Sequence, residues 1–170
     1  MKTISKSLII LLVSATTSIF AENIYIDGSV ESRCSIFSDT AGRFGNPSAF
    51  KLSTTPADGG QEPIIRYDVS LASAYYASIS TPVSFSTSPT LGDSTTFTGA
   101  VTVSQTSSSD MSGYQAASTT PAANTRQYAL TVAGSTWFKA TSVALYGGGN
   151  QTPLPSGEYR AIVLATCIPM

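Results

Sequence analysis

The chain has 170 residues with nine basic and ten acidic side chains and no histidine. So few basic residues exclude a nucleic-acid-binding protein, which has to neutralise phosphates. The lack of histidine excludes Ser-His-Asp catalysis and histidine-ligated zinc.

Residues 1–21 have the pattern of a cleaved signal peptide. Lys2 and Lys6 give a basic start, the run 8–13 is apolar, and Ala21 is a small residue at the expected cleavage point. The apolar run is too short to span a bilayer as a helix. We therefore expect an exported, soluble protein whose mature chain has the size of one domain.

Residues 22–32 are expected to form a half-buried β-strand at the start of the mature chain. Ile24, Ile26, Gly28 and Val30 alternate with polar residues, so they share one face of an extended chain. A chain end usually frays unless something holds it, so this strand needs a partner.

The rest of the chain is a series of short alternating runs separated by Gly, Pro, Asn and Asp clusters, without a helical stripe. Ser and Thr, 49 residues together, suit the outward strand positions of an exported β-protein. The pattern predicts an all-β, antiparallel β-sandwich with loops at 104–113 and 147–157. The predicted strands lie around 50–52 and at 64–73, 75–80, 82–86, 97–105, 127–134, 143–146 and 158–168.

Cys34 and Cys167 are the only cysteines. In an exported chain oxidation is the default, and two cysteines allow a single intramolecular pairing. If that bond forms, it joins the first strand to the last, and the loop-entropy model gives a stabilisation of the folded state of up to about 4 to 5 kcal/mol. A free-thiol or metal role is disfavoured because no other soft ligand is present.

The ten carboxylates are scattered singly and form no DxD or ExxE pair. A glycosidase needs two carboxylates that converge in a cleft, and solvated carboxylates are far commoner. We therefore expect no enzyme, no cofactor and no metal site. Trp137, the single tryptophan, is interpreted as a core or edge aromatic in preference to a sugar-stacking platform.

Several short motifs follow the leader in a fixed order. A strand of the form N-I-x-V-x-A-x-V is matched by Asn23, Ile24, Ile26, Gly28 and Val30, and a P-S-A-V-K-L-like stretch by residues 47–52. A G-Y-x-A-S run has its counterpart in 111–118, and a closing A-G-x-Y-x-x-x-V strand in 155–166. In this set the chain resembles the major pilins of the alternate, class 5 (alpha-clade) chaperone–usher fimbriae, the colonization factor antigen family. It departs from them in its two cysteines, in Gly28 and in the tail 167–170.

The resemblance implies an incomplete immunoglobulin-like β-sandwich that lacks its last strand. Residues 22–32 would be the donor strand, which fills the gap in the next subunit, and 33–170 the pilin domain. The implied partners are identical or related pilins, a periplasmic chaperone, an outer-membrane usher and a host-cell receptor, and the implied location is the periplasm and then a surface fimbrium. The implied acceptor groove lies between the strand that begins near Arg33 and the C-terminal strand. Its wall would be formed by Ile36, Tyr159, Ala161, Val163 and Ala165.

Two other readings stay open at this point. One is a self-complete secreted β-sandwich in which residues 22–32 pair within their own chain, acting as a carbohydrate-binding module or a tip adhesin with Trp137 at its site. The other, ranked third, is an exported hydrolase that uses scattered carboxylates.

Overall fold

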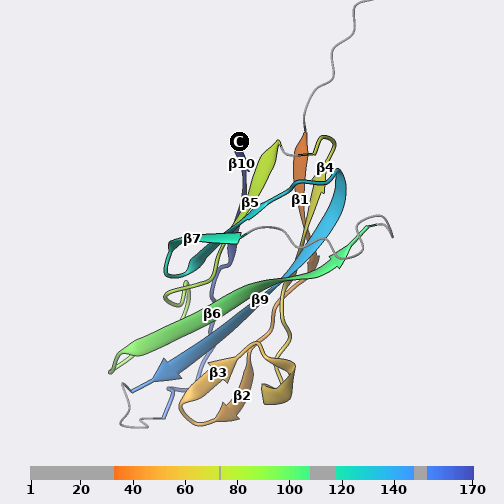
Figure 1. Cartoon of the computed structure of the whole chain (residues 1–170). Helices are drawn as coiled ribbons and strands as arrows, with labels where there is room; N and C mark the ends of the chain where they lie inside the picture. The colour runs from red at the N-terminus through yellow and green to blue at the C-terminus, as the bar shows by residue number, and fades with distance from the viewer. Residues whose placement is uncertain (1–32, 73, 108–117, 148–152) are drawn as a thin grey trace, which may run out of the picture. The chain divides into compact units, whose positions relative to one another are not determined.

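A computed structural model describes residues 33–72, 74–107, 118–147 and 153–170, and all of them belong to one compact unit. This part of the chain consists of β-strands and one short 3-10 helix, without an α-helix (Figure 1). The elements are β1 (Cys34–Thr40), β2 (Gly45–Ser48), β3 (Lys51–Ser53), η1 (Pro56–Asp58), β4 (Ile64–Val69), β5 (Tyr75–Ser80), β6 (Thr95–Thr106), β7 (Ser118–Ala122), β8 (Thr125–Ala129), β9 (Gly134–Tyr146) and β10 (Leu164–Pro169).

The strands form two antiparallel sheets. The first has the order β1-β4-β9-β3-β2, with β6 paired along the other edge of β9. The second has the order β10-β5-β8-β7. The two long strands β6 and β9 run side by side across the molecule (Figure 1). The all-β prediction is confirmed, and the arrangement is compatible with the predicted β-sandwich.

The core lies between the two sheets and is built on aromatic rings. Tyr67 of β4 and Phe138 of β9 are completely buried and meet edge to face, with ring centroids 5.5 Å apart. Tyr128 of β8 packs on Phe138 from the second sheet, at 4.8 Å. The Tyr67 hydroxyl donates to the carbonyl of Ser78, at 3.2 Å, and to that of Thr166, at 3.3 Å, so it ties the first sheet to β5 and β10 of the second. Burial raises the pKa of this hydroxyl, which keeps it a neutral donor.

The predicted strands at 64–73 and 97–105 are found in the structure as parts of β4 and β6. Ile65, Tyr67 and Val69 are buried and alternate with partly exposed residues along β4, whereas Leu71 lies beyond the end of the strand. Gly99 of β6 lies against Thr81. A Cβ at this glycine would lie 2.5 Å from the Thr81 Oγ1 atom, so the close approach requires glycine.

One strand prediction is wrong, and others have wrong bounds. Residues 82–86 form no strand: Pro82 lacks an N–H, and in the described residues the β-bridge next to this segment is the isolated one between Thr87 and Arg160. The predicted strand 158–168 begins only at Leu164, as β10. The run 143–146 is a strand, as predicted, but it is only the end of β9, which begins at Gly134. The sequence pattern did not predict the earlier part of β9, because several residues on its buried face are small or polar. These are Thr136, Phe138, Ala140, Ser142 and Ala144.

Candidate functional site

The first and the last strand of the described chain are both edge strands. Among the described strands, β1 pairs only with β4 and ends the first sheet, and β10 pairs only with β5 and ends the second. β1 begins and β10 ends at the same end of the molecule (Figure 1). There the disulfide between Cys34 and Cys167 joins the two strands, and the Cα atoms of these cysteines lie 6.3 Å apart. This is the single intramolecular pairing that the sequence allows.

The segment that leads into β10 shows the alternation expected of a groove wall. Tyr159, Ala161, Val163 and Ala165 are half-buried, and the residues between them are exposed. Val163 and Ala165 pack against the central core. Among the described residues, no backbone hydrogen bond reaches 161–163, although Arg160 just before them pairs with Thr87. The segment therefore presents unpaired peptide groups beside a row of inward side chains.

On the opposite side, β1 turns alternate side chains toward the same space. Ile36 and Ser38 lie opposite the buried Tyr67 and Ile65 of β4, so they face inward, whereas Phe37 lies opposite Arg66 and faces outward. Ile36 keeps 38% of its surface exposed, which is high for an inward-facing isoleucine. An apolar side chain on this face is thus only partly covered.

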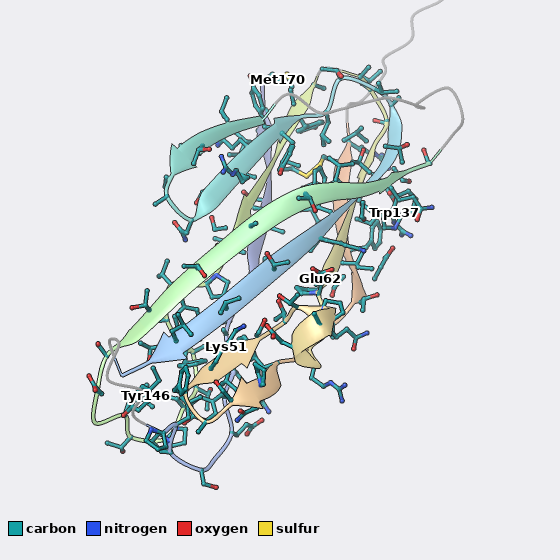
Figure 2. The ribbon with its side chains drawn as sticks, turned by 60° about the horizontal axis from the view of Figure 1, so that its bottom comes forward. Lys51, Glu62, Trp137, Tyr146 and Met170 are labelled. Carbon is teal, nitrogen blue, oxygen red and sulfur yellow. A yellow bond between two sulfur atoms is a disulfide. The ribbon has the colours of Figure 1, made fainter. Side chains whose placement is uncertain are left out.

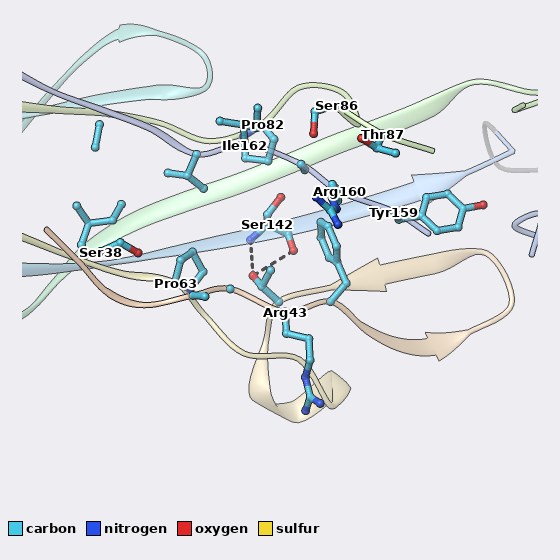
Figure 3. Close-up of a pocket in the computed structure, with 18 of the residues that line it drawn as sticks. Ser38, Arg43, Pro63, Pro82, Ser86, Thr87, Ser142, Tyr159, Arg160 and Ile162 are labelled. Atoms are coloured by element: carbon cyan, nitrogen blue, oxygen red, sulfur yellow. Dashed lines mark hydrogen bonds between the residues drawn. The ribbon is translucent and has the colours of Figure 1, made fainter. Parts of the chain in front are cut away.

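Between these two walls the described residues enclose a groove of about 890 Å³ (Figure 3). All five wall residues suggested by the resemblance border it: Ile36, Tyr159, Ala161, Val163 and Ala165. Figure 3 shows Ser38 toward one end and Tyr159 at the other, and the side chain of Arg43 pointing away. Further lining residues come from distant segments and could not be found from the sequence. They include Phe44, Thr54, Pro82 and Ser142, while Ile65 could be placed inward by its strand alternation.

Several polar groups of the groove are paired within the domain, although the Ser142 hydroxyl has no partner among the described residues. The Ser142 N–H donates to Thr54 Oγ1 at 2.8 Å, and that hydroxyl donates to the Ser142 carbonyl at 3.3 Å (Figure 3). The Tyr159 hydroxyl donates to the Pro155 carbonyl at 2.6 Å, and its ring packs on Phe85 with centroids 5.0 Å apart. Burial raises the pKa of Tyr159, so its hydroxyl stays neutral. The groove therefore offers mainly apolar contacts. The charged residues among its described lining are Arg43, which points away, and Arg160, which is paired with Glu158.

The outer face of the first sheet carries the only tryptophan of the chain. The Trp137 indole N–H donates to Asp39 Oδ2 of β1 at 2.6 Å, and the Arg66 guanidinium lies 3.5 Å from the same carboxylate. Arg66 also stacks on Phe37 of β1, 4.5 Å from the ring centroid. Figure 2 shows Trp137 at the outside of the molecule. These contacts hold the edge strand β1, one wall of the groove, to β4 and β9.

No group of three or more His, Cys, Asp or Glu side chains that could hold a metal ion occurs in the part of the chain that the structure describes. In the same residues, no helix has the length and apolar character needed to cross a membrane.

Ile24, Ile26, Gly28 and Val30 of the predicted donor strand, and the signal peptide, lie outside the described residues. The described chain starts at Arg33, whose N–H donates to the Ser70 hydroxyl at 2.9 Å and whose carbonyl accepts from the Ser70 N–H. Arg33 thus extends β1 at the disulfide end of the groove.

Comparison of the chain with protein-family models, with curated proteins and with solved structures gives no match.

Proposed function

We propose that this protein is a structural pilus subunit that polymerises by donor-strand exchange. Residues 22–32 of one copy fill the groove between β1 and segment 159–165 of the next copy. The observation that carries the proposal is a match of pattern. The groove wall has four alternating inward side chains, and segment 22–32 has four alternating positions on one face.

Strand addition would satisfy both the polar and the apolar groups of the groove. An added strand hydrogen-bonds to an exposed sheet edge through its main chain and places alternate side chains in pockets. The unpaired peptide groups of 161–163 and the open edge of β1 supply such edges. Ile24, Ile26 and Val30 would each contribute about 1.5 to 3 kcal/mol on full burial, and Gly28 almost nothing.

A chain with both a donor strand and an acceptor groove forms a particular kind of assembly. The contact between copies is head to tail, because the donor segment of one chain meets a different surface of the next. A head-to-tail contact that does not close into a ring produces an open filament. The proposed product is an immunoglobulin-like domain that each neighbour completes, repeated along an adhesive surface fibre.

An exposed apolar groove beside two strands that each have one open edge favours aggregation before assembly. The proposed remedy is a periplasmic chaperone that lends a strand to the groove until an outer-membrane usher exchanges it for the strand of another subunit. The disulfide fits such an exported route, because disulfides form in oxidising compartments. A receptor on a host cell would bind the finished fibre.

Matched substitutions in the mature chain test the proposal. Ile36→Asp places a carboxylate in the groove, whereas Leu164→Asp places one on a side chain that is 58% exposed and does not line it. We expect the Ile36 variant to give monomers or chaperone-bound chains, and the Leu164 variant to give denaturant-resistant multimers like the wild type, both judged by unboiled denaturing gels. Equal polymerisation of both variants would overturn the proposal.

A further inference from the structure

The disulfide lies where the next pocket of the groove would be. On the C-terminal wall the inward positions are spaced by two residues, so Cys167 follows Ala165. On β1, Cys34 precedes Ile36 in the same way. The groove is lined by Ile36 and Ala165 but by neither cysteine, and both cysteines pack against the core. The bonded sulfur atoms therefore fill the space between the walls at this end.

The donor segment needs such a boundary. A strand that slips by one residue turns its apolar face outward, but a slip of two residues keeps the same face inward. Segment 22–32 has apolar or glycine residues at 24, 26, 28 and 30, flanked on that face by Glu22 and Ser32. Gly28 has no side chain to fix a pocket, so alternation alone leaves the register weakly specified.

We propose that the Cys34–Cys167 disulfide is the register stop of the groove. It occupies the fifth inward position, so a donor strand can place four residues on its inner face and no more. A donor is then selected for its length as well as its pattern: the residue after the fourth position has to remain outside the groove. Here that residue is Glu22 or Ser32, according to the direction of the strand, and a polar side chain suits that place.

This inference rests on the proposed function, and a cycle of substitutions in the mature chain tests it. Polymers are prepared from the wild type, from Glu22→Leu and from Ser32→Leu, each with both cysteines and in a Cys34→Ala/Cys167→Ala background. The rate at which multimers dissociate in urea is then followed on non-reducing gels. For one of the two leucine variants, we expect the dissociation rate with the disulfide present to lie within about twofold of that of the wild type. In the cysteine-free background, the same variant should dissociate at least about tenfold more slowly than the cysteine-free chain without the leucine, because a fifth pocket has opened.

If neither leucine variant depends on the disulfide in this way, the register stop is wrong. If the unsubstituted chain forms no denaturant-resistant multimers, the proposed function itself fails, so the two failures are distinguishable.

A second measurement does not require the cysteine-free chain to fold. A photo-crosslinking residue at position 24 or 30 of the otherwise wild-type chain is activated in the polymer. We expect the position nearer the disulfide to crosslink to Ile36 or Ala165 of the neighbouring copy. Crosslinks from either position to Ile168–Met170, beyond the disulfide, would overturn the register stop.

Discussion

Removal of the disulfide should destabilise the domain strongly, because the bond closes nearly the whole described chain into one loop. Cys34 and Cys167 are separated by 133 residues, for which the chain-entropy relation gives about 5 kcal/mol at 25 °C. β1 and β10 belong to different sheets, and each has a single paired neighbour among the described strands, so no ladder of hydrogen bonds between these strands replaces the lost link. We expect Cys34→Ala/Cys167→Ala to lower the free energy of unfolding by an amount approaching this value.

Urea unfolding measures this difference. Ile24→Asp/Ile26→Asp is introduced into both proteins so that strand exchange between copies does not contribute, and the fluorescence of Trp137, the only tryptophan, reports unfolding. With a urea dependence of about 2 kcal/mol per molar, the midpoint should fall by about 2 to 3 M. A fall of less than about 0.5 M at an unchanged slope would show that β1 and β10 stay together without the bond, and would refute this reasoning.

Three further changes probe side-chain contacts that stabilise the domain. Tyr67→Phe removes the hydroxyl that links the two sheets and should lower the free energy of unfolding by about 1 to 2 kcal/mol in urea titrations. Folding raises the pKa of Tyr67, so the stability that this residue gives the wild type should be fully present below the ordinary tyrosine pKa of 10.0 and should fall as the pH rises above it. The free energy of unfolding of the phenylalanine variant should fall less over the same pH range. Identical alkaline profiles of the two proteins would contradict this. Trp137→Phe removes the hydrogen bond to Asp39 and should lower the urea midpoint by an amount equivalent to about 1 kcal/mol, with unfolding followed by circular dichroism. An unchanged midpoint would show that this hydrogen bond does not stabilise the attachment of β1. The hydrogen bond from Lys51 lowers the pKa of Asp58, so its stabilisation should be present above pH 3.8 and be lost as the pH falls through the lower folded value; Asp58→Asn should flatten the acid limb of the unfolding profile, and a superimposable limb would argue against the pair.

The sequence could reveal those parts of the fold in which apolar residues alternate with polar ones. Ile65, Tyr67 and Val69 show this pattern openly, and so do the half-buried positions from Tyr159 to Ala165. The disulfide was the only pairing that two cysteines allow, and the structure contains it. In these places a local period of two residues determines the buried face.

The remainder depends on contacts that the local pattern does not encode. Thr136 and Ser142 are buried in β9 although their side chains are polar, so the strand lacked an apolar signature. Thr54 and Phe44 reach the groove through the order of the strands, which a single sequence does not disclose. The run 82–86 has strand-like residues, but the bridge next to it in the described residues is a single isolated one, between Thr87 and the distant Arg160.

The central claim is that segment 22–32 of one copy fills the groove of another, and a complementation experiment tests it most directly. One mature chain carries Ile24→Asp/Ile26→Asp and should lack a working donor strand. A second carries Ile36→Asp and should lack a working groove. Each alone should remain free of multimers, and their mixture should form a single denaturant-resistant heterodimer, because only one intact strand and one intact groove are available. Multimers from either chain alone, or a mixture that stays monomeric while the wild type polymerises, would contradict the claim.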